Sequence, residues 1–390
     1  MARKPLDLST LHPETRLALT GRDPGGSEGG VNPPVQHAST IVIEDAADLF
    51  NPAVQTYARQ GVAVHRALSA ALVAVEGGAE AILAPSGLAA CVLALMTFAR
   101  GGGHLLVTDS VYGPTRRFCD RTLARMGVRT EYFDPRIGAG IAALIRDDTS
   151  AIFLESPGSQ TFEIQDVPAI AAAAKARDVR TIIDNTWSAG VFFKPFDHGV
   201  DLSVQALTKY QGGHADLLCG AVLAREPALA TRVYQTHRDL GLAVAPDDAY
   251  SALRGMRTLA VRLARQADSA RQIAQRLSLL PQVARVLHPA MESHPDHRLW
   301  KRDFTGASGL FSIVLKPVET ARLNAMLESL SLFAMGFSWG GYESLILPCD
   351  PQLTRTAVPW KAEGPLVRLS IGLEHPDDLI ADLERGLASM

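Results

Sequence analysis

The fold is set by two stretches of sequence, TIID at residues 181–184 and DLSVQALTK at residues 201–209. The first is short and rich in β-branched residues, so it predicts a buried strand that ends at Asp184. The second predicts another strand, and this strand leads to Lys209. An acid and a lysine that come directly after neighbouring strands face the same crevice, which is where α/β sheets bind their ligands.

This pair of residues has two interpretations. Pyridoxal 5′-phosphate (PLP) needs a lysine for its Schiff base and often an aspartate beside its pyridine nitrogen, so Lys209 and Asp184 fit a PLP site. The alternative is an aspartate that ends a strand and a lysine that lies on the surface. The pair alone does not decide between these interpretations, so the other residues must be considered.

Length and composition narrow the class of protein. A chain of 390 residues is too long for one small core, so we expect two domains and an arm. The hydrophobic content of 47% and the charged content of 20% are typical of a folded soluble protein. The net charge of -3 provides no basic field, and we expect no nucleic-acid partner. The 4 cysteines form no CxxC pair, which favours core thiols in a reducing compartment over a zinc site.

The sequence also predicts no membrane partner. Residues 1–20 contain no apolar stretch of signal-peptide length. The longest apolar run, at residues 88–99, is too short to span a bilayer. We therefore expect a cytoplasmic enzyme.

The order of predicted elements indicates an α/β fold with a smaller second domain. Residues 1–60 contain Gly and Pro clusters that break regular structure, so we expect an N-terminal arm that contacts a neighbouring subunit. From 61 to 250 short strands alternate with helices, which predicts a mostly parallel sheet. From 251 to 390 the pattern changes to α+β, beginning with one long helix expected over residues 252–279.

Other positions fit a cofactor site but have ordinary alternatives. Ser86, Gly87 and Leu88 lie at a predicted strand-to-helix turn, where unpaired N–H groups suit a phosphate. Tyr112 comes after the next predicted strand and could stack on a flat cofactor, or it is an ordinary half-buried tyrosine. The hydroxyl of Thr208 could donate to a phosphate, or it caps a turn.

Arg368 is a charge inside an apolar run, and a charge in a strand is costly unless it is paired. Its partner is either a bound carboxylate, which the guanidinium matches as a fork, or an internal glutamate. His294 and His297 have no third ligand nearby, so we interpret them as surface residues and expect no metal site.

Together these residues resemble the Cys/Met-metabolism family of PLP-dependent enzymes, from about Tyr57 to the C-terminus. The motifs that carry the likeness are Tyr57-x-Arg59, Ser86-Gly87, Tyr112, Asp184-Asn185-Thr186, ALTKY at 206–210 with GHxD at 213–216, and Ser344-Leu345. Within the family the sequence is most similar to the cystathionine β-lyases, through FLESPGS at 153–159, WKRDFTG at 300–306, SWGGYESL at 338–345 and RLxIGLE at 368–374. The resemblance implies fold type I, with a PLP-dependent transferase-like domain built on a seven-stranded type of sheet.

The resemblance also implies residue roles. It assigns cofactor binding to Tyr57, Arg59, Ser86, Gly87, Leu88, Tyr112, Asp184, Thr208 and Lys209, with the Schiff base on Lys209. It assigns catalysis to Lys209, Tyr112 and Ser338, and substrate binding to Arg368, Trp339, Ser338, Tyr57 and Arg59. In this interpretation Tyr57 and Arg59 reach the phosphate of a neighbouring subunit, and Arg368 holds the substrate α-carboxylate.

The implied activity is a carbon–sulfur β-elimination in sulfur amino-acid metabolism. Its substrate is an amino-acid thioether, cystathionine, which yields homocysteine, pyruvate and ammonia; cystine or cysteine could also serve. The implied assembly is a homo-oligomer with shared active sites, a tetramer built as a dimer of dimers. A γ-synthase or γ-lyase is the alternative, disfavoured because those relatives usually carry leucine where this chain has Trp339. A PLP-binding regulatory protein is a further alternative, disfavoured because Lys209, Asp184, Arg368 and Tyr112 are all present.

Overall fold

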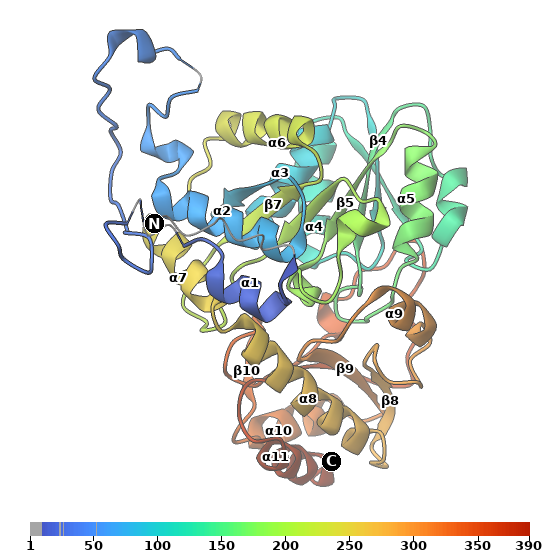
Figure 1. Ribbon diagram of the computed structural model, residues 1–390. Coiled ribbons are helices and arrows are strands. Elements are labelled where there is room, and N and C mark those ends of the chain that lie inside the picture. The colour runs from blue at the N-terminus through green and yellow to red at the C-terminus, as the bar shows by residue number, and fades with distance from the viewer. Residues whose placement is uncertain (1–9, 23–24, 26, 52) are drawn as a thin grey trace.

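The structure is a computed structural model that describes residues 10–22, 25, 27–51 and 53–390 (Figure 1). It contains a seven-stranded sheet in a large α/β region and a five-stranded sheet in a smaller region nearer the C-terminus. The remaining parts of the predicted arm, residues 1–9, 23, 24, 26 and 52, lie outside the described residues.

The large sheet has the mostly parallel arrangement that the sequence predicts. Its strand order is β1-β7-β6-β5-β4-β2-β3, in which β7 runs antiparallel to both neighbours and the other pairs are parallel. The strands are β1 (Glu80–Ala84), β2 (His104–Thr108), β3 (Arg129–Phe133), β4 (Thr149–Glu155), β5 (Arg180–Asp184), β6 (Leu202–Gln205) and β7 (Gly220–Ala224). Because β5 and β6 are parallel neighbours, their carboxyl ends open at the same edge of the sheet.

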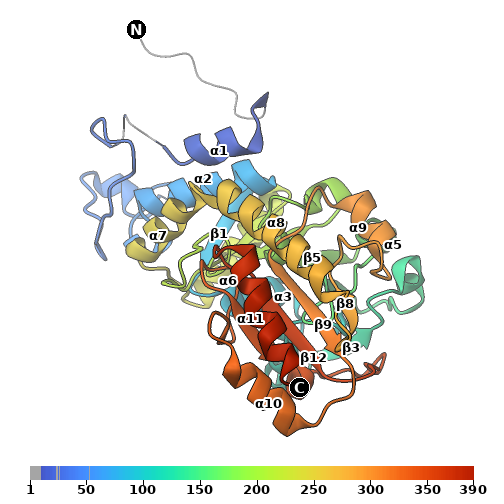
Figure 2. The same cartoon turned by 90° about the horizontal axis from the view of Figure 1, so that it is seen from below.

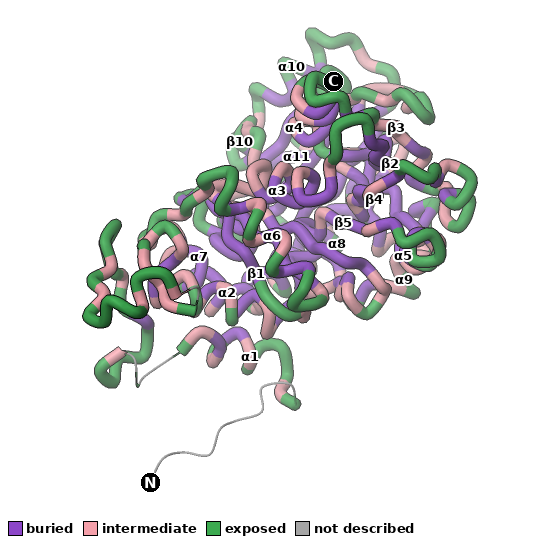
Figure 3. The backbone as a smooth tube through the Cα atoms, turned by 90° about the horizontal axis from the view of Figure 1, so that it is seen from above, coloured by how far each residue is buried: buried purple, intermediate pink, exposed green. Residues whose placement is uncertain are grey.

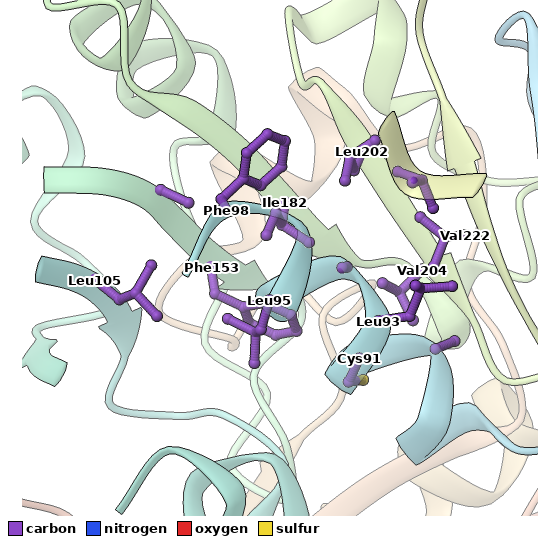
Figure 4. Close-up of a cluster of buried hydrophobic side chains, with 14 of the residues drawn as sticks. Cys91, Leu93, Leu95, Phe98, Leu105, Phe153, Ile182, Leu202, Val204 and Val222 are labelled. Atoms are coloured by element: carbon purple, nitrogen blue, oxygen red, sulfur yellow. The ribbon is translucent and has the colours of Figure 1, made fainter. Parts of the chain in front are cut away.

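Helices cover both faces of this sheet, so that every residue of β2, β6 and β7 is buried. They are α2 (Ala63–Glu76), α3 (Gly87–Phe98), α4 (Gly113–Arg117) with a π-helical turn at Phe118–Leu123, α5 (Val167–Lys175), α6 (Pro227–Asp239) and α7 (Pro246–Met256). On one face α3 packs on β6 and β7, and α6 packs on β1 and β7. Figure 4 shows Leu93 beside Val204, and Leu95 beside Phe153 of β4. On the opposite face, α2 and α7 share a core with β1 and β7.

The smaller sheet joins the two parts of the molecule. Its order is β10-β11-β12-β9-β8, and its strands are β8 (Val283–Leu287), β9 (Leu310–Leu315), β10 (Ala334–Met335), β11 (Leu345–Pro348) and β12 (Leu366–Ser370). Its outer face packs against α8 (Leu259–Leu277), α10 (Thr320–Ser329) and α11 (Pro376–Ala388), as Figure 2 shows from below. Its inner face shares a core with β4, β5 and α5, and α9 (His297–Asp303) lies beside this junction.

The long helix predicted over residues 252–279 is wrong, because the chain forms two helices, α7 and α8, separated at Arg257–Thr258. A tertiary contact explains the break. Arg262 Nη2 donates to the carbonyl oxygen of Gly255 at 2.7 Å, and Arg262 Nη1 donates to Tyr210 O at 2.7 Å. Gly255 itself packs so closely on Gln211 that an added Cβ would lie 2.2 Å from the Gln211 carbonyl oxygen.

The described part of the arm is mostly exposed, as the green tube in Figure 3 shows. Its one α-helix, α1 (Pro13–Leu19), is attached to the body by Arg257 Nη1, which donates to Leu17 O at 2.9 Å. Phe50 and Val42 are 95% and 84% exposed, so this segment makes few apolar contacts with its own chain. Among the described residues, no helix is both long and apolar enough to cross a membrane.

Candidate active site

The carboxyl edge of the large sheet opens into a cavity of about 700 Å³. The cavity is lined by strand ends, by the first turns of α3 and α4, and by loops of the smaller sheet. Of the predicted site residues, its walls include Ser86, Gly87, Leu88, Tyr112, Asp184, Thr208, Lys209, Trp339 and Arg368. Most of the predicted site therefore meets in one place.

Lys209 lies in contact with two of the predicted substrate residues. Its Nζ donates a hydrogen bond to Ser338 Oγ at 3.0 Å and lies 5.2 Å from the centre of the Trp339 ring. Burial lowers the pKa of Lys209 to about 8, and the positive charge of Arg368 acts in the same direction. A lysine with this pKa is partly uncharged near neutral pH, which a nucleophile or a base requires.

Asp184 ends β5 and faces the same cavity. Its Oδ1 accepts hydrogen bonds from Thr186 N at 3.1 Å and Thr186 Oγ1 at 2.6 Å, and its Oδ2 accepts one from Cys91 Sγ at 3.7 Å. Burial raises the pKa of Asp184, and these hydrogen bonds oppose the rise. A carboxylate in this position gains from a cationic partner, which a protonated pyridine nitrogen supplies.

Arg368 on β12 is buried, and none of the described carboxylates forms an ion pair with it. Its Nη2 donates to the carbonyl oxygens of Phe337 at 3.1 Å and Ser338 at 3.0 Å. Burial lowers the pKa of Arg368. The internal glutamate considered as its partner is therefore absent from the described chain, and a ligand carboxylate fits the rest of the fork.

The expected phosphate site is the N-terminus of α3. Ser86 is the N-cap, and its Oγ accepts from Ala89 N at 3.1 Å, which leaves the N–H groups of Gly87 and Leu88 without an intrahelical partner. A Cβ on Gly87 would lie 2.4 Å from Ala206 Cβ, so glycine allows the helix to approach the turn that carries Lys209. Thr208 lines the cavity, while its hydroxyl exchanges hydrogen bonds with the backbone of Cys219.

Tyr112 stands at the start of α4 with 43% of its surface exposed. Its backbone N–H donates to Glu155 Oε2 at 2.6 Å, and Glu155 pairs in register with Asp184 across β4 and β5. Burial and the charge of Asp184 raise the pKa of Glu155 well above its usual value. Glu155 lies in the predicted FLESPGS stretch, but the sequence assigned it no role because nothing local indicates its contact with Tyr112.

Two further groups support the cavity and were missed from the sequence. Glu76 is a buried carboxyl at the C-terminal end of α2. It accepts hydrogen bonds from Asn185 Nδ2 at 2.7 Å, from Ser203 Oγ and from Gln205 Nε2 at 2.8 Å. These donors adjoin Asp184 and the turn that carries Lys209, so Glu76 fixes both strand ends.

The second group fastens a loop of the smaller sheet over the cavity. The carboxylate of Asp109 accepts backbone N–H groups of Thr356, Ala357 and Val358 at 2.9 to 3.1 Å, and it also pairs with Arg116. The contacts with this loop join residues more than 200 positions apart, so no local pattern could reveal them.

Tyr57 and Arg59 lie outside this cavity of their own chain. Tyr57 is 47% exposed, and Arg59 Nη1 reaches Arg238 O at 3.5 Å. Their expected place beside the phosphate of another subunit stays a prediction.

The interpretation of His294 as a surface residue is wrong. His294 is buried, its Nδ1 accepts from Asp296 N at 3.1 Å, and burial lowers its pKa to about 4. The loop folds inward because Arg136 forms a bidentate pair with Asp296, at 2.8 Å from Nε to Oδ1 and from Nη2 to Oδ2. Within the described ranges, no cluster of His, Cys, Asp or Glu has the composition of a metal site.

The residues that line the cavity fit PLP at its phosphate, at its ring nitrogen and at the carbon that forms a Schiff base. The N-terminus of α3 suits a phosphate, Asp184 suits a protonated ring nitrogen, and Lys209 has the amine that a Schiff base needs. Tyr112 offers a ring for stacking beside this group.

Comparisons with known proteins agree with this chemistry. Residues 14–388 match the family described as Cys/Met metabolism PLP-dependent enzyme. A relative from Rhizobium johnstonii, provisionally named a cystathionine beta-lyase, is 48% identical over 96% of each chain. The cystathionine beta-lyase of Escherichia coli is 42% identical over 100% of this chain and 99% of its own.

Neighbouring activities occur among the similar proteins as well. The crystal structure of a cystathionine gamma-lyase from Lactobacillus plantarum, complexed with L-serine, matches with a TM-score of 0.90 and 32% identity over 97% of this chain and 99% of that one. A relative from Wolbachia pipientis, 38% identical over 97% of each chain, is named an L-alanine/L-glutamate racemase.

Proposed function

The chain belongs to the Cys/Met metabolism family of PLP-dependent enzymes, and we propose that it catalyses β-elimination of an amino-acid thioether. Cystathionine is the proposed substrate, with homocysteine, pyruvate and ammonia as products. The observation that carries the proposal is the environment of Lys209, a lysine of lowered pKa between the carboxylate of Asp184, the guanidinium of Arg368 and the ring of Trp339.

In the proposed site, Lys209 binds PLP, Asp184 holds its ring nitrogen protonated, and Gly87, Leu88 and Thr208 hold its phosphate. The bound cofactor supplies an electron sink that makes the substrate Cα–H bond acidic enough to break. The stacking position over the ring belongs to Tyr112.

Side chains of the protein bind and orient the substrate and transfer the protons. Arg368 binds the substrate α-carboxylate through the N–H groups that its two carbonyl contacts leave free. This contact orients the Cα–H bond toward Lys209 Nζ, which takes the proton as an uncharged amine once the substrate amino group has replaced it on the cofactor. Ser338 Oγ holds Nζ in position before that transfer. In this proposal the Tyr112 hydroxyl gives a proton to the departing sulfur.

Trp339 favours β- over γ-elimination. A γ-elimination needs a second proton removed from Cβ, and Lys209 must swing to carry it. Trp339 packs against both Lys209 and the Tyr210 ring, whose centroid lies 5.4 Å away, so it limits this swing. γ-Elimination is the second candidate reaction, because the similar structure from Lactobacillus plantarum is a cystathionine gamma-lyase. Racemisation is a third, because the relative from Wolbachia pipientis is named a racemase and racemisation removes the same Cα proton. Cystine and cysteine remain candidate substrates beside cystathionine.

The proposed assembly is a homotetramer in the cytoplasm, in which Tyr57 and Arg59 complete the phosphate site of a neighbouring subunit. The exposed arm and the position of both residues outside their own cavity support the sharing of sites between subunits. Co-refolding Arg59→Ala chains with Lys209→Ala chains should restore part of the activity, because one site of each hybrid dimer would be intact. Hybrids that remain inactive would refute the sharing of sites.

The cofactor assignment is tested by borohydride reduction of PLP-loaded protein, with peptide mapping to locate the reduced adduct. The label should fall on Lys209. Lys194 is the internal control, because it is also partly buried and burial lowers its pKa, but its Nζ donates to backbone carbonyls outside the cavity. Label on Lys194 or on another lysine, or protein that takes up no PLP, would overturn the proposal.

A further inference from the structure

Two buried polar residues of α8 contact the two segments that meet at Lys209. Arg262 and Gln266 are four residues apart, so they lie on the same face of the helix, about 6 Å apart along its axis. Arg262 is 5% exposed and Gln266 is 0% exposed. None of the described residues that line the cavity belongs to α8, so neither side chain can act on a ligand directly.

Arg262 holds the turn that carries Lys209. Its Nη1 donates to the carbonyl oxygen of Tyr210 at 2.7 Å, and the turn is closed by Gly213 N, which donates to Lys209 O at 2.7 Å. A Cβ on Gly213 would lie 2.0 Å from Arg262 Nη1, so the guanidinium packs directly on this turn. Burial lowers the pKa of Arg262 to about 10, so the buried charge depends on the carbonyl oxygens that it contacts.

Gln266 holds the loop at residues 338–341. Its Nε2 donates to the carbonyl oxygen of Gly341 at 2.7 Å. The neighbouring Gly340 has a φ of +80°, which favours glycine, and a Cβ there would lie 3.2 Å from the carbonyl carbon of Lys209. The loop therefore lies against the turn, and each of the two segments has its own anchor on α8.

The side chains of the two segments meet at Lys209 Nζ, which donates to Ser338 Oγ at 3.0 Å and lies 5.2 Å from the centre of the Trp339 ring. Both contacts favour the charged form of the amine, because the hydroxyl accepts a hydrogen bond from it and the ring attracts a cation. The charged groups that act on the pKa of Lys209 are Arg368, which lowers it, and Asp184, which raises it. A shift of the turn or the loop relative to α8 changes the contacts with the hydroxyl and the ring.

We propose that Arg262 and Gln266 are positioning residues of the active site. Together they fix the turn that carries Lys209 relative to the loop that carries Trp339. This inference rests on the proposed function, because it takes Lys209 as the base of the reaction and Trp339 as the group that limits its swing. Neither arginine nor glutamine touches the reacting atoms, so their effect falls on the basicity and the freedom of the lysine.

The test uses the PLP-loaded enzyme and S-propylcysteine, a cysteine thioether with one carboxylate. Gln266→Met keeps an unbranched side chain but removes the donor to Gly341, and Arg262→Lys keeps the charge but loses the fork that holds the turn. In each variant the pH midpoint of kcat should fall by roughly half a pH unit, a factor of about three in proton affinity. The direction follows from the loss of contacts that favour the charged amine of Lys209.

The double variant, Arg262→Lys with Gln266→Met, separates joint from independent action. If the two residues fix one relative position, releasing the second segment adds little once the first is free, so the shift should not exceed the larger of the two single shifts. The pH midpoint of the absorbance of bound PLP should move in the same variants, and this readout needs no turnover. The ratio of 2-oxobutyrate to pyruvate released from cystathionine should rise about threefold, because Trp339 limits the swing of Lys209 less.

Ser269→Ala is the matched control, because Ser269 is buried on the same face of α8 and its Oγ has no hydrogen-bond partner among the described residues. It should leave both pH midpoints at their wild-type values. Unchanged midpoints in Gln266→Met, additive shifts in the double variant, or an equal shift in Ser269→Ala would overturn the inference. Failure of the proposed function looks different, because wild-type enzyme would then release no pyruvate from S-propylcysteine, while the absorbance of bound PLP would still report on the turn and the loop.

Discussion

Replacing Arg368 by lysine separates charge from geometry at the α-carboxylate site. Arg368→Lys keeps a positive charge but removes the planar fork. In the structure one nitrogen, Nη2, already holds the carbonyl oxygens of Phe337 and Ser338, so the carboxylate needs the other N–H groups. A single ammonium group cannot serve both the loop and the ligand in the same geometry.

The size of the effect can be worked out from these contacts. A hydrogen bond to a charged group contributes about 1.5–3 kcal/mol, and about 1.4 kcal/mol corresponds to a tenfold change. We therefore expect kcat/KM for S-propylcysteine to fall roughly 10- to 150-fold in Arg368→Lys. The affinity for PLP should stay near the wild-type value, because Arg368 is not among the residues assigned to the phosphate or the ring nitrogen.

The assay measures pyruvate release under steady-state conditions and PLP affinity by absorbance titration. Arg265→Lys is the matched control, because Arg265 Nη2 also donates to a backbone carbonyl, Glu374 O at 3.3 Å, but lies outside the cavity lining. It should leave kcat/KM within about twofold of the wild type. A value for Arg368→Lys within about threefold of the wild type would refute the carboxylate role and leave Arg368 as an anchor of the 337–338 loop.

The charges of the described residues lead to three other predictions. Because Lys209 must lose a proton to act as a base and burial lowers its pKa to about 8, kcat should rise with pH through about 8, and a flat profile there would contradict this role. Glu76→Leu removes the shared acceptor of three buried side-chain donors, two of which keep a second acceptor, so urea unfolding should show a loss of about 1–3 kcal/mol of unfolding free energy, and less for Glu76→Gln. Burial lowers the pKa of His288 and His294 to about 4, so stability should be lost as pH falls from 6.5 toward about 4. Stability should fall less steeply with decreasing pH when both histidines are replaced by glutamine. Equal slopes of stability against pH in the wild type and the double variant would contradict the effect of burial.

The parts of the site that the sequence predicts share one property. Asp184, Lys209 and Ser86 each lie at or just beyond the end of an apolar strand, and parallel strands bring the residues at their carboxyl ends to the same edge of the sheet. Arg368 was recognisable because a charge within an apolar strand requires a partner. These inferences depend on patterns a few residues long, which is why they agree with the fold and with the residues that line the inner cavity.

The remainder depends on contacts between distant residues. The break between α7 and α8 arises because Arg262 takes the Gly255 carbonyl, and the helical pattern of residues 252–279 carries no sign of it. His294 is buried by a loop that the Arg136–Asp296 pair draws inward. The sequence around Glu76 is that of an ordinary glutamate at a helix end, because its three hydrogen-bond donors come from distant residues.

β-Elimination is tested most directly by the identity of the keto acid that wild-type protein releases from cystathionine, measured by chromatography. We expect pyruvate together with homocysteine, with little 2-oxobutyrate or cysteine, and a lower rate of pyruvate release in Trp339→Leu. Release of mainly 2-oxobutyrate would contradict the β-elimination assignment and make the reaction a γ-elimination. Cystathionine that changes only in configuration, without releasing a keto acid, would contradict both elimination reactions and favour racemisation.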